Sequence, residues 1–329
     1  FIRFTSGTTG SSKGVMLSHQ TVEDRVYCAN TALKIKPGDR VLCVLSMAYH
    51  FVVSIILYLR NGACIVVSKG INASQMLADI GKHHITFIYA APMQIKLLSG
   101  DMGKQNMPSV RLVISTSASI GRELCDRFFA RYGIAVSQAY GIIELGLPIV
   151  NDNGEDPESV GRCVDGFKAA ILDEHAQPLS IGKLGELGLK GPGMLDAYLS
   201  PYKKREEILV NGWFLTGDLA LMDEEGRIKI AGRKKTVINV SGNKVFPEEV
   251  EAVIEEIPQV KCCKVKGVPH VLTGELVQAE VVLKTGFHPP DQEEMIRFCR
   301  KHLSAYKVPQ RILFVDQLET TGSGKTKRT

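Results

Sequence analysis

The sequence predicts an α/β protein in which a mostly parallel α/β subdomain is followed by an antiparallel, barrel-like subdomain and a small α+β C-terminal domain. Three observations predict this fold. Up to about residue 140, short β-branched runs alternate with amphipathic helical segments, which requires crossover connections and favours parallel strands. From about residue 160, short strands separated by turns follow one another directly. After a basic cluster at residues 233–235, helices and strands alternate again.

The first part of the chain carries clear helix boundaries. Ser18 is a good N-cap for a helix over residues 19–33, and Pro37 and Gly38 end it. Pro92 suits the first turn of another helix. In order, we expect helices at 19–33, from about 52, and at 76–84, 92–98 and 120–133. The strands expected between them lie at 40–46, 63–67, 85–90, 111–115 and 134–140.

The second part of the chain begins with strands and ends with a mixed unit. A Glu-Glu-Gly turn at 224–226 joins the last two strands before the basic cluster into a hairpin. The strands expected here lie at 167–174 and 185–191 and on both sides of that turn within 218–232. The C-terminal unit is expected to contain helices at 247–257 and 291–303 and strands at 260–268, 275–284 and 311–318.

Composition places the chain among globular proteins of about two domains. It has 329 residues, of which 23% are charged and 44% hydrophobic, and its net charge is +5. No basic helix or aromatic–basic stripe appears, so we expect no nucleic-acid partner. The longest apolar run, at 51–59, is too short to span a bilayer, so we expect no transmembrane segment. The chain begins at Phe1, which leaves open whether the natural N-terminus lies upstream.

The eight cysteines are spread along the chain without the spacing of a metal site. Several lie in apolar runs. We therefore expect buried free thiols and a cytoplasmic protein rather than disulfides and secretion.

Residues 4–16, FTSGTTGSSKGVM, form a loop suited to holding phosphate. Its glycines let the backbone N–H groups turn toward an anion, its hydroxyls donate hydrogen bonds, and Lys13 supplies positive charge. The alternative is a flexible linker, but apolar residues flank the loop and a helical pattern follows it. The loop does not have the P-loop pattern.

Seven later stretches match motifs of a known protein family. They are SMAYHF at 46–51, STSASI at 115–120, QAYGIIE at 138–144, WFLTGDLA at 213–220, AGRKK at 231–235, INVSGNKVFPEEVE at 238–251 and the segment 306–328. Some of them have a simpler interpretation, since a lone His is often structural, a lone Glu at a strand end is usually solvated, Thr-Gly-Asp is an ordinary turn, and Arg-Lys-Lys is a solvated linker.

Together these stretches, in order and over nearly the whole chain, resemble the motifs of the acyl-adenylate-forming (AMP-binding) superfamily. Residues 238–251 and the Tyr-Lys-Val-Pro string at 306–309 are similar to its acyl-CoA synthetase branch. Members of that family have a large N-terminal subdomain before the phosphate loop, and the sequence begins just before that loop, which leaves open whether the protein has this subdomain. The resemblance implies an AMP-binding domain at 1–234, truncated at its N-terminus, and a mobile C-terminal domain at 235–329 that turns about Lys235.

The resemblance also implies roles for individual residues. Glu144 would bind Mg²⁺, His50 would lie beside the acyl pocket, and Lys325 would be the catalytic lysine. Asp218 and Arg233 would contact the ribose or phosphate. The other residues expected to contact ATP or CoA are Thr5, Ser6, Gly7, Thr8, Thr9, Gly10, Lys13, Ser117, Ala139, Tyr140, Gly141, Ser241 and Gly242.

The chain departs from the family pattern at a few positions. Ile143 replaces a threonine and cannot hydrogen-bond a phosphate, which would cost roughly 1.5–3 kcal/mol. Residues 115–120 have Thr and Ser in place of the usual glycines, and Glu319 replaces a proline. For Ile143, either other residues compensate for the lost hydrogen bond or adenylation is slow.

The resemblance implies an acid–thiol ligase that uses ATP, Mg²⁺ and CoA. A carboxylic acid, expected to be a fatty or other apolar acid, would be activated to acyl-AMP and transferred to CoA. Alternatives are transfer to an acyl carrier protein, a non-catalytic nucleotide or acyl-CoA binder, and a hydrolase or kinase built on the Walker A-like tail. Glu319 stands where a P-loop needs its first glycine, which argues against the last. The sequence does not decide whether the protein forms a homodimer.

Overall fold

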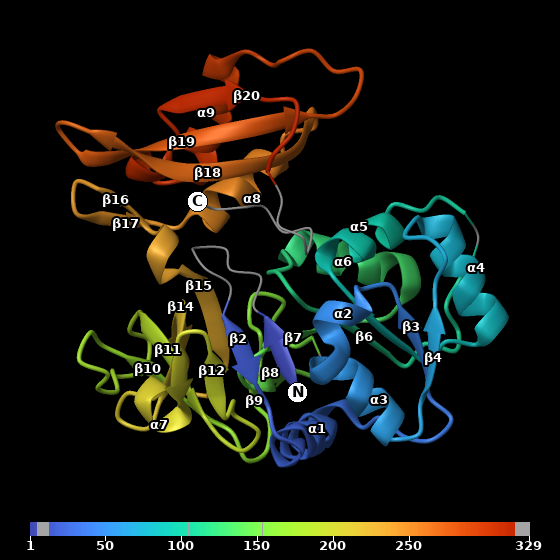
Figure 1. Cartoon of the computed structure of the whole chain (residues 1–329). Helices are drawn as coiled ribbons and strands as arrows, with labels where there is room; N and C mark the ends of the chain where they lie inside the picture. The colour runs from blue at the N-terminus through green and yellow to red at the C-terminus, as the bar shows by residue number, and fades with distance from the viewer. Residues whose placement is uncertain (5–12, 104, 153, 320–329) are drawn as a thin grey trace. The chain divides into compact units, whose positions relative to one another are not determined.

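The computed structural model describes residues 1–4, 13–103, 105–152 and 154–319 (Figure 1). These residues divide into two compact units. The larger unit contains the described residues up to 216, together with 221–230, and the smaller unit contains 217–220 and 231–319. The mixed α/β architecture confirms the predicted fold class.

A seven-stranded sheet forms the centre of the larger unit, with strand order β4-β3-β5-β6-β7-β8-β9. Five of its strands are parallel neighbours, as the alternation of strands and helices predicts. Strands β8 and β9 then continue the sheet in antiparallel fashion, which was not expected. The strands are β3 (Arg40–Cys43), β4 (Cys64–Val67), β5 (Phe87–Ala90), β6 (Leu112–Ser115), β7 (Val136–Ile142), β8 (Gly146–Asn151) and β9 (Arg162–Cys163).

Helices connect these strands, and their ends follow from local chemistry. The Ser18 hydroxyl accepts a hydrogen bond from the Thr21 N–H at 3.1 Å and so caps the first helix, as predicted. Asn72 caps the fourth helix through the Gln75 N–H. Figure 1 shows α5 and α6 side by side. The helices are α1 (His19–Leu33), α2 (Met47–His50), α3 (Ile56–Arg60), α4 (Ala73–His83), α5 (Pro92–Ser99), α6 (Arg122–Tyr132) and α7 (Arg205–Ile208).

The helix expected from about residue 52 begins earlier than predicted. It starts at Met47, and α2 and α3 are joined by a π-helical turn over Phe51–Ile55. Val52 and Ile55 on that turn are buried, whereas Phe51 is exposed. The apolar run therefore begins inside the helical segment and not at its first residue.

One hydrophobic core lies between the parallel strands and helices α4, α5 and α6. Met76 and Ile80 from α4, Ile95 from α5 and Phe128 from α6 are fully buried there against Ile88 of β5. Each of these helices presents apolar residues at helical spacing to the sheet. This core fixes the strands whose ends carry candidate site residues.

Two further sheets, each of four strands, are antiparallel. Their strand orders are β1-β2-β12-β13 and β10-β11-β14-β15. The hairpin predicted around Glu224-Glu225-Gly226 is present. In its turn, Gly226 has φ +75° and its N–H donates to the Asp223 carbonyl. The strands are β1 (Ile2–Phe4), β2 (Gly14–Met16), β10 (Lys168–Leu172), β11 (Gly185–Lys190), β12 (Ala197–Leu199), β13 (Tyr202–Lys204), β14 (Phe214–Met222) and β15 (Ile228–Arg233).

The smaller unit contains a five-stranded sheet covered by two helices. A long hairpin of β18 and β19 is its centre, and β20 pairs with β19 in parallel. Val250 and Ile254 of α8 and Cys299 of α9 are buried in a core of its own. The elements are β16 (Ile238–Val240), β17 (Asn243–Val245), α8 (Pro247–Glu255), β18 (Val260–His270), β19 (Gly274–Leu283), α9 (Gln292–His302) and β20 (Arg311–Phe314).

Two further expectations concern thiols and membranes. All eight cysteines are free, as predicted, and four of them are buried. No helix in the described ranges is both long and apolar enough to cross a bilayer.

The N-terminal ends of the parallel strands are held by an ion pair between a buried carboxylate and a solvent-exposed arginine. The Arg111 guanidinium donates to both carboxylate oxygens of Asp39, at 3.0 and 2.6 Å, and Asp39 is 2% exposed. Burial by itself would raise the pKa of Asp39, but bonds from Arg111, Thr86 and the Lys36 N–H outweigh burial and lower it.

We therefore expect Arg111→Met to lower the free energy of unfolding of the larger unit by about 1–3 kcal/mol at pH 7, because it removes two hydrogen bonds from the buried Asp39 carboxylate, while solvent around the exposed guanidinium limits the loss. Since the pKa of Asp39 is lowered in the folded state, this difference should shrink as the pH falls through it. Urea unfolding followed by fluorescence of Trp213, the single tryptophan, measures it. Arg60→Met, which breaks the exposed pair with Glu23, is the control and should have little effect. Equal losses in the two variants would contradict the prediction.

Candidate active site

Apart from Lys13, the predicted site residues that the structure describes in the larger unit lie at or just after the carboxyl ends of its parallel strands, where open α/β sheets bind ligands. His50 ends α2, which follows β3, and Ser117 follows β6 with φ +75°. Ala139, Tyr140 and Gly141 belong to β7. Glu144 lies in the turn between β7 and β8. Pairing of β3, β5, β6 and β7 in parallel register brings these strand ends to one edge of the sheet.

Glu144 and Lys13 meet at one tyrosine. The Tyr198 hydroxyl donates to Oε1 of Glu144 at 3.0 Å, and the Lys13 ammonium lies 4.7 Å from the centroid of the Tyr198 ring. Burial, together with the Glu144 carboxylate, raises the pKa of Tyr198 well above its usual value, so the hydroxyl stays protonated and can donate. The structure thus joins the lysine of the predicted phosphate loop to the predicted metal ligand.

Sequence reasoning missed Tyr198. It lies on β12, whose pairing with β2 brings Tyr198 opposite Val15. A lone tyrosine in a short strand carries no spacing that points to a site. Only the pairing between strands far apart in the sequence reveals its place.

Gly141 is required by the space around it. A Cβ on this residue would lie 2.7 Å from Cδ2 of Leu147 and 3.0 Å from the Gly146 carbonyl oxygen. The register of β7 and β8 also shifts between Tyr140 and Ile142. The turn that carries Glu144 therefore closes tightly over Gly141.

His50 lies at the edge of a buried group of aromatic and hydroxyl side chains. Its ring packs edge-on against Tyr89, with 5.8 Å between centroids. The Tyr89 hydroxyl donates to Oγ1 of Thr116 at 3.3 Å, and Thr116 donates to the Ala139 carbonyl at 3.2 Å. Burial raises the pKa of Tyr89 to about 12. These contacts link the ends of β5, β6 and β7 behind the candidate site.

The predicted ribose and phosphate residues of the smaller unit pair with each other. Nε of Arg233 lies 2.7 Å from Oδ1 of Asp218, whose side chain is 5% exposed while that of Arg233 is 49% exposed. The buried carboxylate is thus oriented by an accessible cation. An ionised Asp is an acceptor only, which suits it to the hydroxyls of a sugar.

Ser241 and Gly242 form the exposed tip of the β16–β17 hairpin. Both have positive φ, +50° and +83°. The Ser241 N–H donates to the Thr273 carbonyl at 2.8 Å, and the Gly242 N–H donates to Oδ1 of Asn239 at 2.9 Å. The tip is therefore ordered by its own hydrogen bonds and by the neighbouring hairpin.

Some predicted site residues lie outside the described residues. They are Thr5, Ser6, Gly7, Thr8, Thr9, Gly10 and Lys325.

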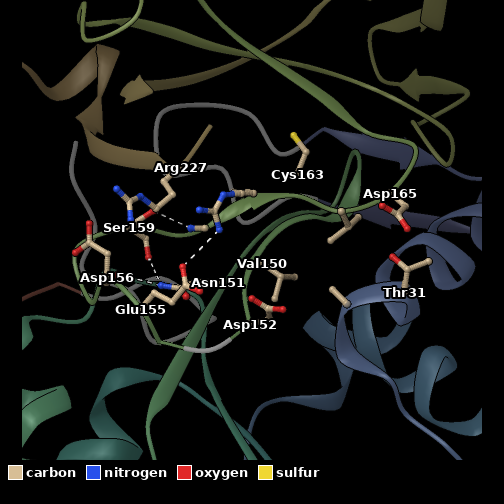
Figure 2. Close-up of a pocket in the computed structure, with 14 residues that line it drawn as sticks. Thr31, Val150, Asn151, Asp152, Glu155, Asp156, Ser159, Cys163, Asp165 and Arg227 are labelled. Carbon is tan, nitrogen blue, oxygen red and sulfur yellow. Dashed lines mark hydrogen bonds and ion pairs between the residues drawn. The ribbon is translucent and has the colours of Figure 1, made fainter. Parts of the chain in front are cut away.

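A polar cavity of about 230 Å³ lies elsewhere in the larger unit, between α1 and the segment that follows β8 (Figure 2). Its polar side chains are already hydrogen-bonded to the main chain of the protein. Asn151 donates to the carbonyls of Asp156 and Ser159, and the Ser159 hydroxyl donates to the Ile228 carbonyl. The residues that line it in the described part of the chain include none of the predicted site residues. We assign this cavity no role in the chemistry.

The donor set at Glu144 fits a magnesium ion bound together with phosphates. Among the described residues, no group of three His, Cys, Asp or Glu side chains could hold a metal by itself. Mg²⁺ commonly takes only one or two carboxylates and completes its shell with phosphate oxygens and water. The single carboxylate of Glu144 meets that requirement.

Comparison with known proteins gives the family. Residues 1–199 match the model of the AMP-binding enzyme family, and residues 249–325 match the AMP-binding enzyme C-terminal domain.

Individual relatives agree with these matches. A long-chain-fatty-acid–CoA ligase of Escherichia coli O157:H7 is 29% identical over 340 residues, which cover 100% of this chain and 60% of the relative. A sulfoacetate–CoA ligase of Cupriavidus necator is 31% identical, with 99% and 65% covered. The O-succinylbenzoate coenzyme A synthetase MenE from Bacillus subtilis, solved with ATP and magnesium ion, superposes with a TM-score of 0.90 at 25% identity, with 99% and 68% covered. The chain spans about 60% of the length of the E. coli ligase. It belongs to the AMP-binding enzyme family.

Proposed function

We propose that the protein is an acid–thiol ligase that activates a carboxylic acid with ATP and transfers the acyl group to CoA. The observation that carries the proposal is the contact of Lys13 and Glu144 with the same tyrosine at the carboxyl edge of a parallel sheet. Family membership supports the same chemistry, because relatives named as CoA ligases match along the whole chain.

The reaction has two displacement steps. A carboxylate oxygen of the acid attacks the α-phosphorus of ATP, and the bond to the leaving pyrophosphate breaks. The CoA thiolate then attacks the acyl carbonyl carbon, and AMP leaves. Transfer of this kind depends on positioning and on neutralising charge rather than on covalent help from the protein.

The chain's residues divide these tasks. Lys13 and the loop before it would hold the phosphates, and Glu144 would hold Mg²⁺, which neutralises phosphate charge when bound. Asp218 and Arg233 would orient the ribose, since the Asp218 carboxylate is buried and its cation is accessible. Lys325 would bridge the carboxylate and the α-phosphate and stabilise the charge that develops there.

For the acid we propose an apolar substrate, such as a fatty acid. The side chains near the strand ends that support this choice are aromatic or aliphatic, among them Tyr89 and Ile142. The named relatives act on acids as different as long-chain fatty acids and sulfoacetate, so a screen must cover several chemical classes.

A second candidate is a nucleotide or acyl-CoA binder without ligase activity. Ile143 favours it, because this side chain offers a phosphate no hydroxyl next to Glu144. Such a protein would bind ATP without releasing pyrophosphate.

The function is tested by measuring pyrophosphate release from Mg-ATP over a panel of carboxylic acids, with and without CoA. We expect release that depends on the acid, with AMP and a CoA thioester as products. ATP binding without any release across the panel would favour the binder. ADP as the product would exclude the ligase.

The role of Lys325 is tested by Lys325→Ala. We expect the adenylation rate to fall by roughly 10²–10³, the usual cost of removing one donor to the charge that develops in the transition state. Thioester formation from supplied acyl-AMP should change much less. Lys327→Ala, two residues away, is the matched control. Adenylation that stays within a few-fold of the wild type would contradict the role.

The tight turn at Gly141 is tested by Gly141→Ala. The added methyl group must displace Leu147 or the Gly146 carbonyl, and so shift the turn that carries Glu144. We expect adenylation to fall about 10²-fold, as for other small misplacements of reacting groups. Gly81→Ala in α4, where an added Cβ meets nothing within 4 Å, is the control and should retain full activity. A Gly141→Ala variant as active as the control would contradict this expectation.

A further inference from the structure

Arg25 is a fully buried cation in the middle of α1. It is 2% exposed, and its guanidinium donates to three main-chain carbonyls that are more than 110 positions away in the sequence. Nη1 donates to the Ile143 carbonyl at 3.0 Å and Nη2 to the Glu144 carbonyl at 3.2 Å. Nε and Nη2 donate to the Gly193 carbonyl at 3.1 and 2.6 Å.

These carbonyls come from two segments that the site needs. One is the turn between β7 and β8, which carries Glu144. The other leads into β12, which carries Tyr198. The segments also bond to each other, because the Leu195 N–H donates to the Glu144 carbonyl at 2.7 Å. The main chain of Glu144 is thus held by Arg25 and Leu195, and its carboxylate by Tyr198.

The backbone of both segments lies directly against Arg25. A Cβ on Gly193 would come within 2.7 Å of Cβ of Arg25, and a Cβ on Gly146 within 3.2 Å. Both glycines have positive φ, +73° and +84°, which other residues rarely adopt. Such close approach leaves the turn little freedom to move independently of Arg25.

Helix α1 is itself anchored to the second segment. The Asp196 carboxylate accepts from the Ser18 N–H at 2.5 Å and from the Thr21 hydroxyl at 3.0 Å, and it pairs with Arg205 at 3.0 Å. Burial lowers the pKa of Arg25 to about 10, although the carboxylates of Glu144 and Asp196 act to raise it. Arg25 therefore remains charged near neutral pH and keeps all its donors.

We propose that Arg25 is a positioning residue for the metal site: by fixing the carbonyls of Ile143, Glu144 and Gly193, it sets the place from which the Glu144 carboxylate binds the divalent cation of Mg-ATP. This inference rests on the proposed function, in which Glu144 is the metal ligand. Arg25 itself touches neither metal nor substrate.

The geometry also accounts for the tolerance of isoleucine at position 143. The contact that Arg25 makes there is to the main-chain carbonyl, which every residue has. The turn thus keeps its shape without the hydroxyl that the resemblance leads one to expect, and only a phosphate contact is lost.

The test is Arg25→Lys, which keeps the charge but replaces a planar fork of donors by one point donor that cannot reach all three carbonyls. We expect the Mg²⁺ concentration for half-maximal pyrophosphate release to rise at least tenfold, the usual cost of losing a partner that orients a metal ligand. The maximal rate at saturating Mg²⁺ should stay within a few-fold of the wild type. An unchanged Mg²⁺ requirement would overturn the proposal.

Arg111→Lys is the matched control. Arg111 also donates to a carboxylate and to a main-chain carbonyl, but at the N-terminal ends of the strands, away from the candidate site. It should lower the midpoint of unfolding and leave the Mg²⁺ requirement unchanged. Equal shifts of the Mg²⁺ requirement in both variants would mean that Arg25 acts only through general stability.

A second variant guards against failure of Arg25→Lys to fold. Arg25→Gln carries no charge to bury and still donates to a carbonyl, and we expect at least the same rise in Mg²⁺ requirement. Trp213 fluorescence reports whether each variant is folded. A folded Arg25→Gln with the wild-type Mg²⁺ requirement would also overturn the proposal.

A separate measurement tests the role of Arg25 if the proposed function is wrong. If the wild type releases no pyrophosphate with any acid, the same variants are compared by calorimetric binding of ATP with and without Mg²⁺. We expect Mg²⁺ to strengthen ATP binding in the wild type and in Arg111→Lys, and to do so at least tenfold less in Arg25→Lys. Equal strengthening in Arg25→Lys, or none in the wild type, would overturn the positioning role.

Discussion

A guanidinium group cannot escape burial by losing its proton at neutral pH, so the interior around Arg25 must supply acceptors for its charge. The carbonyls of Ile143, Glu144 and Gly193 meet that need. They can do so only if the β7–β8 turn and the segment before β12 converge on α1. The placement of Glu144 and Tyr198 thus follows from a requirement that is electrostatic rather than hydrophobic.

The two units satisfy their own packing requirements separately. The larger unit buries apolar faces of α4, α5 and α6 against the parallel sheet, and the smaller unit buries α8 and α9 against its hairpin sheet. Asp218 and Arg233 pair within the smaller unit, whereas Lys13, Glu144 and Tyr198 meet within the larger one. Each unit therefore presents its own preformed set of polar groups.

Local patterns were enough to predict most of the fold. The helix from His19 to Leu33 follows from its serine cap and its terminating Pro-Gly, and the buried parallel strands follow from β-branched runs. Strands as short as β1, β9 and β12 have no periodicity to detect, because two or three residues cannot show an alternating pattern and the strands are defined by their pairing. For the same reason sequence motifs indicated Glu144 and Asp218, but nothing indicated Tyr198 or Arg25. The role of a single tyrosine or arginine can be recognised only from its contacts in the three-dimensional structure.

One cysteine is more accessible to thiol reagents than the others. Cys64 is exposed, at the start of edge strand β4, while the other seven cysteines are buried or half-buried. Burial raises the pKa of six of these seven, namely Cys28, Cys43, Cys125, Cys163, Cys263 and Cys299. Cys64 pairs with Arg40 at the amino ends of the parallel strands. A maleimide dye or spin label would therefore attach first at Cys64, at the end of the parallel strands opposite to the one that carries Glu144, where it leaves the candidate site open to ligands.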